Sequence, residues 1–186
     1  MQTDKMLKSD QTFHIRKAQP SEFEVIGKLL VTVYSGLPGF PKEQDLPDYY
    51  KMLRTIGNLT EKSKTELLAA LNQNQEVLGA VVYIGDMKHY GSKGKAPQEI
   101  NAAGIRLLAV TPESRGMGIG KALTLACIEK AKESGLSQVI LHTTSLMPTA
   151  WKMYIGMGFQ RAPELDFEQR DMVVHGFRLN LQLTKT

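Results

Sequence analysis

Apolar and polar positions at the start of the chain predict a tail, a strand and then a helix. Residues 1–11 are polar and are expected to form a loosely held tail. From Phe13 to Arg16 apolar and polar side chains alternate, which predicts a strand. Pro20 and the acidic residue soon after it are typical of a helix start. The apolar side chains that follow have the three- and four-residue spacing of a helix: Phe23, Ile26, Leu29, Leu30 and Val33.

Two β-prone runs dominate the middle of the chain, after a breaker-rich loop and a weaker helix candidate over 46–56. The runs Thr65 to Leu71 and Val77 to Ile84 are joined by a short polar turn, so they predict an antiparallel hairpin. Residues 86–103 contain glycine, proline and lysine without any periodicity. A loop of that length within a compact domain is usually functional or mobile.

A strand, a glycine-rich turn, a helix and a second strand then follow one another. The apolar run from Ile105 to Val110 ends at a proline signal, which favours a buried strand. In the turn from Arg115 to Gly120, every second residue is glycine. One face of the next helix carries Ile119, Ala122, Leu123, Ala126 and Ala131. Gly135 is expected to end this helix, and 138–144 is again β-rich, so the unit predicts a parallel crossover.

The last part of the chain predicts one more helix and one more strand. Pro148 opens a short helix that Gly158 ends. Its apolar face holds Ala150, Met153, Tyr154 and Met157. A strand with one buried face follows from the alternating apolar positions Phe177, Leu179, Leu181 and Leu183. Val173 and Val174 are expected to belong to the same strand, with Gly176 at a bulge.

Composition adds that the chain is one ordinary soluble domain. Its 186 residues are 42% hydrophobic and 23% charged, and no linker or repeat divides them, so residues 1–186 are taken as a single domain. No apolar run approaches the ~18 residues that span a bilayer, and the start of the chain lacks the apolar core of a signal peptide. These features predict a protein without a membrane partner.

Charge and cysteine content narrow the class of partner. Cys127 is the only cysteine in the sequence, which fits a reducing cytoplasm and a thiol packed inside a helix. The net charge of +4 permits an anionic ligand. Lysine and arginine are scattered, without a run of five or more, so no nucleic-acid partner is expected.

The glycine turn supplies the candidate chemistry. A strand, a glycine-rich turn and a helix N-terminus make a concave array of backbone N–H groups that suits phosphate. A Walker A loop would need a glycine at position 115 and a hydroxyl side chain at position 122, but this chain has Arg115 and Ala122 there. A dinucleotide fingerprint that begins at Gly116 would need glycine at Lys121. Both of these phosphate sites are therefore excluded by their residues.

The pattern Arg115-x-x-Gly118-x-Gly120 resembles the signature of the GNAT superfamily of acyl-CoA-dependent N-acyltransferases. The strand and turn before it, LLAVTPESRG, and the later segment Ala150-x-x-Met153-Tyr154-x-x-x-Gly158-Phe159 resemble further elements of that family. The resemblance implies an α/β fold with a twisted, mostly antiparallel sheet, in which the fourth and fifth strands are a parallel pair. About four helices would flank that sheet.

The resemblance also implies a ligand and its site. Acetyl-CoA would be the co-substrate, with its pyrophosphate on the amides of Arg115, Gly116, Met117, Gly118, Ile119, Gly120 and Lys121. The pantetheine arm would pair with the backbone of Leu108, Ala109 and Val110, and the Val110 N–H would face the thioester carbonyl. Tyr154 would be the general acid for the departing thiolate. No metal is expected, because the histidines have no ligand spacing and there is one cysteine.

The resemblance leaves three questions open. Several family members have a glutamate as base where this chain has Gly104, and the remaining candidates for a base are Glu99, Asp86, His142 and His89. The acceptor is expected to be a small-molecule or peptide amine, but its identity stays open. The oligomeric state also stays open, and a homodimer is one alternative. Two alternatives to an N-acetyltransferase also stay open: a catalytically silent acyl-CoA-binding sensor, and a nucleotide-binding protein without acyl chemistry.

Overall fold

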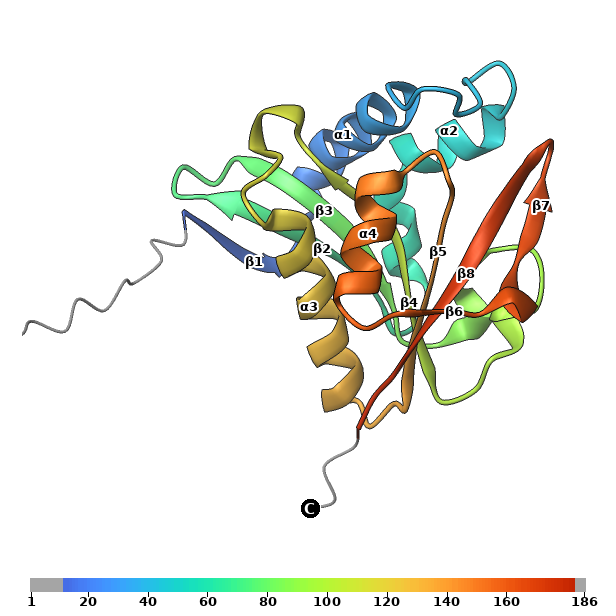
Figure 1. Ribbon diagram of the computed structural model, residues 1–186. Helices are drawn as coiled ribbons and strands as arrows, with labels where there is room; N and C mark the ends of the chain where they lie inside the picture. Colours follow the sequence, from blue (N-terminus) through green and yellow to red (C-terminus); the bar gives the residue numbers. More distant parts are fainter. Residues whose placement is uncertain (1–11, 183–186) are drawn as a thin grey trace, which may run out of the picture.

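The structure, a computed structural model, describes residues 12–182. These residues fold around one large sheet (Figure 1). The expected tail over residues 1–11 and the apolar position Leu183 lie outside the described residues. The strands are β1 (Phe13–Lys17), β2 (Thr65–Asn72), β3 (Val77–Ile84), β4 (Ala102–Val110), β5 (Gln138–Thr143), β6 (Gln160–Arg161), β7 (Phe167–Gln169) and β8 (Met172–Asn180). The α-helices are α1 (Phe23–Ser35), α2 (Pro47–Arg54), α3 (Ile119–Glu133) and α4 (Pro148–Gly156).

The sheet order is β1-β2-β3-β4-β5-β8-β6, and β7 forms a hairpin with β8. Neighbouring strands are antiparallel except β4 and β5, which run parallel. Mixed pairing with a single parallel pair is what the family resemblance predicts, so that prediction is confirmed. Among residues 12–182, no helix is long and apolar enough to cross a membrane.

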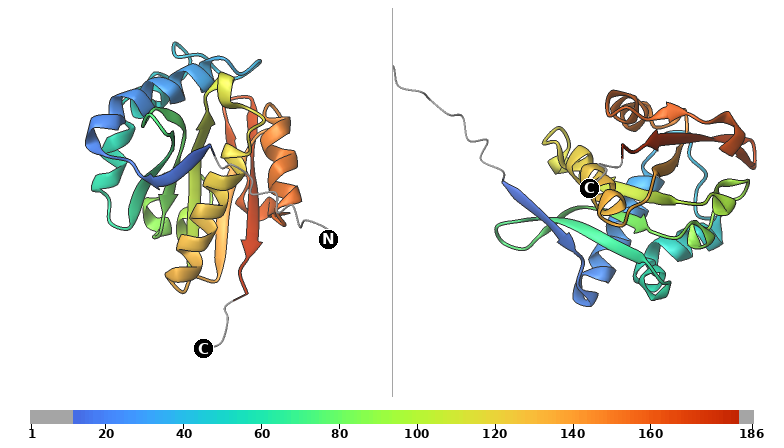
Figure 2. Two further views of the ribbon diagram at one scale, coloured as in Figure 1. Left: turned by 90° about the vertical axis from the view of Figure 1, so that its left-hand side faces the viewer. Right: turned by 90° about the horizontal axis from the view of Figure 1, so that it is seen from below.

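Helices cover the sheet on both faces, and each face has its own core (Figure 2). Helices α1 and α2 pack on one face, with Ile26, Leu30 and Leu53 fully buried. Helices α3 and α4 pack on the other, where Leu123 and Cys127 are fully buried. Full burial of one such aliphatic side chain is worth about 1.5–3 kcal/mol. The burial of Cys127 confirms that this thiol is a packing residue, and burial raises its pKa to about 12.

A β-bulge in β4 reverses which way its side chains point. Arg106 pairs with Val82 and Ala109 with Ala80, so two residues of β4 stand opposite one residue of β3. Leu107, at the bulge, has a φ of +57°. Ile105 faces the core under α3, whereas Leu107 faces the core under α1. A regular strand would send both to the same face, because side chains alternate with a period of two.

Strands β4 and β5 stop pairing at Ile105, just before the bulge. Their parallel pairing runs only from Ala102 opposite Gln138 to Ile105 opposite Leu141. The last residues of β4 therefore pair with β3 on one edge and leave the edge toward β5 open. This opening lies at the carboxyl ends of two parallel strands, where ligands of α/β sheets usually bind.

Several sequence predictions need correction at their ends. Strand β4 begins at Ala102, inside the stretch predicted as a loop, and α2 is shorter than the predicted helix over 46–56. The prediction of a bulge at Gly176 is wrong, because Gly176 stands in regular register opposite His142. A Cβ at Gly176 would lie 2.5 Å from the Cβ of Leu165, so this glycine permits a close approach. The short strands β6 and β7 were not predicted.

Candidate functional site

A cavity of about 380 Å³ lies where β4 and β5 separate, against the N-terminus of α3. Its wall includes all the residues that the family resemblance assigns to acetyl-CoA except Met117, which is 45% exposed. The wall residues from that set are Leu108, Ala109, Val110, Arg115, Gly116, Gly118, Ile119, Gly120 and Lys121. Helix α4 adds Ala150 and Met153, and α1 adds Tyr34.

The N-terminus of α3 presents free backbone donors to this cavity. The first backbone hydrogen bond at this end of the helix runs from Ala122 N to Gly118 O, 3.0 Å. The amides of the three preceding residues therefore have no acceptor within the helix. Gly118 is the N-cap and offers no side chain to satisfy them. Such amides at the positive end of a 15-residue helix suit a phosphate or pyrophosphate.

Backbone conformation explains two glycines of the turn. Gly116 and Gly118 have φ values of +80° and +79°, which favour glycine, and a Cβ at either would meet nothing within 4 Å. The space beside the turn is thus open to a ligand. Gly120 has ordinary helical geometry, and a Cβ there would lie 3.7 Å from the sulfur of Met153. The residues present therefore fit the pyrophosphate of coenzyme A.

The open edge of β4 exposes the amide of Val110. Thr111 donates its N–H to the carbonyl of Leu78 on the β3 side, 2.8 Å. Successive N–H groups of an extended strand face opposite edges, so the Val110 N–H faces the opening toward β5. The Tyr34 hydroxyl makes a long contact of 3.5 Å with the carbonyl of Leu108 at this edge.

Tyr154 is buried on α4 and lines neither this cavity nor the smaller one described below. Its helix neighbours Ala150 and Met153 belong to the cavity wall, whereas Tyr154 itself is 5% exposed and packs edge-on against Phe159, 5.7 Å between ring centroids. Burial raises the pKa of the Tyr154 phenol, so it carries its proton at neutral pH. A protonated phenol is the form that a general acid needs.

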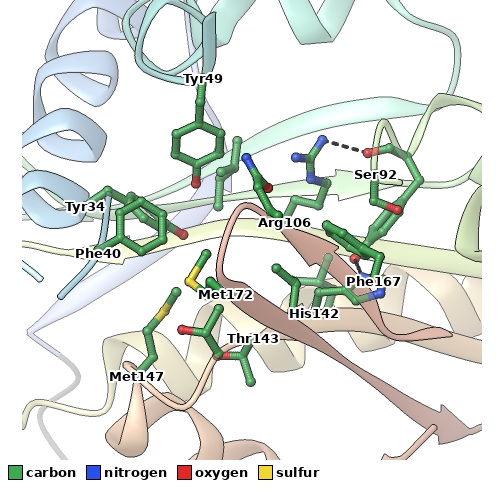
Figure 3. Close-up of a pocket in the computed structure, with 16 residues that line it drawn as sticks. Tyr34, Phe40, Tyr49, Ser92, Arg106, His142, Thr143, Met147, Phe167 and Met172 are labelled. Carbon is green, nitrogen blue, oxygen red and sulfur yellow. Dashed lines mark hydrogen bonds between the residues drawn. The ribbon is translucent and has the colours of Figure 1, made fainter. Parts of the chain in front are cut away.

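A second, smaller cavity of about 90 Å³ is lined by the residues drawn in Figure 3. Tyr34 and Met147 line both cavities, so the two meet at these side chains. The second cavity is walled by α1, α2, the segment after β3, the middle of β4, the end of β5 and the β7–β8 hairpin. Its apolar and aromatic wall includes Phe40, Tyr49, Phe167 and Met172.

One candidate base lines that second cavity, and the others do not. His142 is in the wall. Glu99 is instead paired with Arg178 at 2.8 Å, Asp86 with Lys88 at 3.1 Å, and His89 contacts Ser63 at 3.2 Å. Of the four residues left open by the sequence, the described part of the chain brings only His142 to the cavity.

Both ring nitrogens of His142 are engaged. Nε2 lies 2.8 Å from the carbonyl oxygen of Leu165, which can only accept, so Nε2 carries a hydrogen. Nδ1 lies 2.9 Å from the Tyr90 hydroxyl. Burial lowers the pKa of His142, so the ring is neutral and Nδ1 accepts the hydrogen bond from Tyr90.

The Tyr90 ring occupies the space that a side chain at Gly104 would need. A Cβ at Gly104 would lie 2.4 Å from Cδ2 of Tyr90, so the ring lies directly on this glycine. Tyr90 is 1% exposed and lines the second cavity. No side chain larger than hydrogen fits at Gly104 while Tyr90 holds this position.

Arg106 gives the second cavity its positive charge. Its Nη1 donates to the carbonyl of Tyr90 at 2.7 Å, and its guanidinium lies over the Tyr90 ring at 5.6 Å. No aspartate or glutamate lines this cavity, and no ion pair of Arg106 occurs among residues 12–182. The side-chain hydroxyl of Thr143, which is 2% exposed, is buried there without a hydrogen-bond partner.

Sequence reasoning missed much of this second cavity. It did not single out Tyr34, Tyr90 or Arg106 as site residues. Tyr34 ends the apolar face of α1 and has no special local signal, while Tyr90 lies in a stretch without periodicity. The packing of Tyr90 on Gly104 is a tertiary contact that no local pattern predicts, so the sequence shows only that position 104 is a glycine.

The fold and the paired cavities define a class of protein. A sheet opened between two parallel strands, with a glycine turn at a helix N-terminus, offers a site for a long anionic ligand beside a small second pocket. Residues 30–159 match the model of the Acetyltransferase (GNAT) family, more than half of the chain. The chain therefore belongs to the GNAT acetyltransferase family.

Relatives and solved structures agree with this family. N-acetyltransferase 8F1 of Rattus norvegicus is 41% identical over 54 residues, which is 29% of this chain and 24% of the relative. The chain thus aligns with about a quarter of the length of that curated relative. A GNAT-family acetyltransferase from Staphylococcus aureus Mu50 superposes with a TM-score of 0.69 at 20% identity, covering 91% of this chain and 99% of that one.

A further structural neighbour was solved with a ligand. The PaiA N-acetyltransferase of Thermoplasma acidophilum, in complex with coenzyme A, has a TM-score of 0.67 at 16% identity. The match covers 88% of this chain and 97% of that one. At such identities the likeness establishes the fold.

Proposed function

We propose that this chain is an acetyl-CoA-dependent N-acetyltransferase that acetylates a primary amine by direct attack within a ternary complex. The observation that carries the proposal is the meeting of two cavities at Tyr34 and Met147, beside the open edge of β4. One cavity suits a long anionic ligand and the other a small acceptor. The solved relative that binds coenzyme A supports the same assignment for the larger cavity.

In this proposal the larger cavity holds acetyl-CoA, which supplies an activated thioester. The free amides at the start of α3 bind its pyrophosphate, and Leu108, Ala109 and Val110 bind its arm. The Val110 N–H is the donor for the thioester carbonyl oxygen. A backbone donor that meets developing negative charge is worth about 2.7–4 kcal/mol.

Two proton transfers complete the proposed reaction. The acceptor amine must lose a proton, and we assign its uptake to Nδ1 of His142 through the Tyr90 hydroxyl, because these groups are hydrogen-bonded at 2.9 Å in the wall of the acceptor cavity. The departing thiolate must gain a proton, which we assign to Tyr154. Burial holds the Tyr154 phenol in its protonated form, so the hydrogen that the thiolate needs is present on this side chain.

The experiment that tests the function is thiol release. Purified protein is mixed with acetyl-CoA and a panel of amines, free thiol is measured over time, and products are identified by mass. Amine-dependent thiol release with an N-acetylated product is the expected result. Tight binding of coenzyme A without turnover on any amine would instead favour the silent acyl-CoA sensor. Stabilisation by ATP or NAD and not by coenzyme A would favour the nucleotide-binding alternative.

A further inference from the structure

The acceptor cavity contains a positive charge that the protein itself does not neutralise. Arg106 is half-buried in its wall, where it contacts the carbonyl and the ring of Tyr90. The other arginines that are half-buried in the described residues, Arg16, Arg161 and Arg178, each have a carboxylate partner between 2.7 and 2.8 Å away. Arg106 is the exception, and it faces a cavity.

A guanidinium that is partly removed from water and lacks a counter-ion is unfavourable unless something pairs with it. The carbonyl of Tyr90 occupies Nη1, which leaves further N–H donors on a planar fork. That fork matches a carboxylate, which accepts two parallel hydrogen bonds. The cavity therefore offers a carboxylate site next to the place of reaction.

A second observation in the same wall also points to a ligand. The hydroxyl of Thr143, which is buried and without a hydrogen-bond partner, can donate to a ligand oxygen. Buried polar groups normally have partners, and a native exception needs an explanation. A polar ligand in this cavity would provide the missing partner.

The remainder of the wall describes the rest of the acceptor. Phe40, Tyr49, Phe167 and Met172 supply apolar and aromatic surface, and no acidic side chain is present to receive a second ammonium group. The volume of about 90 Å³ suits a small molecule. Polyamines and multiply cationic amines would meet Arg106 without any compensating charge.

We infer that the acceptor is a free amino acid with an apolar or aromatic side chain, bound by its carboxylate to Arg106. The inference rests on the proposed function and names the substrate class of that same site.

Matched acid and amide pairs test the inference. Phenylalanine, phenylalaninamide, methionine and methioninamide are compared as acceptors by kcat/KM with saturating acetyl-CoA. The amides have the less basic amine, so any preference for the acids must come from the carboxylate. We expect the acids to be better by at least about 30-fold, since losing one partner of a desolvated charge pair costs 2 kcal/mol or more.

Variants of Arg106 then assign the preference to this side chain. In Arg106→Gln the ratio of kcat/KM for the acid to kcat/KM for the amide should fall to near one, because only the acids lose a binding partner. Arg106→Lys should keep part of the preference for the acids. Lys93→Gln removes the same charge from an exposed residue of the neighbouring loop and should leave the ratio unchanged. Equal use of acids and amides by the unmodified protein, or equal loss of both in Arg106→Gln, would overturn the inference. Better use of the dipeptide phenylalanylalanine than of phenylalanine would do the same.

A binding measurement separates this inference from the proposed function. In the presence of coenzyme A, N-acetylphenylalanine should raise the Tm more than N-acetylphenylalaninamide, and Arg106→Gln should abolish that difference. Absence of thiol release with every amine contradicts the proposed function. Absence of the Tm difference, in a protein that does release thiol, contradicts the carboxylate site alone.

Discussion

Tyr90 donates its hydroxyl hydrogen to Nδ1 of His142 across 2.9 Å, directly above a glycine. The contact places a neutral imidazole behind a phenol in the wall of the acceptor cavity. A proton that reaches the Tyr90 oxygen can therefore be balanced by the phenolic proton moving to Nδ1. The Nε2 hydrogen bond to Leu165 O holds the ring in the tautomer that this requires.

The change Tyr90→Phe tests this proton route. The ring should keep its packing on Gly104, while the link from the amine to His142 is broken. We expect kcat to fall by roughly 10²–10⁴-fold with little change in the KM for acetyl-CoA. Tyr83→Phe, at a buried tyrosine on the opposite face, is the matched control and should retain turnover. A pH profile of kcat/KM that keeps the same acid limb in Tyr90→Phe would contradict the role of His142.

Gly104 provides a stability test of the same contact. In Gly104→Ala the new Cβ would lie 2.4 Å from the Tyr90 ring, so the ring or the strand must move. We expect a loss of about 1–3 kcal/mol in the free energy of unfolding. Gly156→Ala is the control, because a Cβ there meets nothing within 4 Å and alanine favours the helix. Urea denaturation measures both, and equal effects would show that Tyr90 does not rest on Gly104.

Local patterns predicted the parts of the site that depend on neighbouring residues. The glycine turn could be recognised because a strand, a turn and a helix start are adjacent along the chain. All of its predicted wall residues but Met117 lie around the larger cavity. The open edge at Val110 followed from the family resemblance, since no local pattern shows that two strands separate.

The acceptor cavity could not be predicted in this way. Leu107 carries a positive φ at the bulge, yet leucine does not favour that conformation, so its sequence has no bulge signal. A glycine within a strand, such as Gly176, predicts a bulge, although a close approach by Leu165 produces the same local signal. Arg106, His142 and Phe167 meet only because three distant segments fold together.

Two glycines at opposite ends of α3 separate backbone strain from ligand binding. Gly118 and Gly135 have φ values of +79° and +69°, and a Cβ at either meets nothing within 4 Å. Each change to alanine should cost about 1–2 kcal/mol of stability. Only Gly118→Ala should also weaken the binding of coenzyme A. We expect a loss of affinity of roughly 10-fold or more, which corresponds to the loss of one charge-assisted hydrogen bond. Calorimetric titration measures this difference, and equal affinities in the two variants would place the pyrophosphate elsewhere.

Tyr154 and Tyr34 are competing candidates for the general acid. Tyr154→Phe should lower turnover by roughly 10²–10⁴-fold and leave acetyl-CoA affinity nearly unchanged. Tyr34 lines both cavities, and burial raises its pKa to about 12, so its phenol is also protonated. The same measurements on Tyr34→Phe are therefore the comparison. Wild-type turnover in Tyr154→Phe, together with a large loss in Tyr34→Phe, would move the assignment to Tyr34.

His142 should make folding sensitive to mild acid. Burial lowers its pKa in the folded state, whereas in the unfolded chain the pKa is about 6.5. Above pH 6.5 the imidazole is neutral in both states, so it does not change how the free energy of unfolding depends on pH. As the pH falls through about 6.5, the unfolded chain binds a proton that the folded protein does not, so the free energy of unfolding decreases until the lower folded pKa is reached. His142→Gln should remove this part of the pH dependence below about pH 6.5 in urea denaturation. His14→Gln, at an exposed histidine of β1, is the control, and an unchanged slope in His142→Gln would mean that His142 is not held neutral.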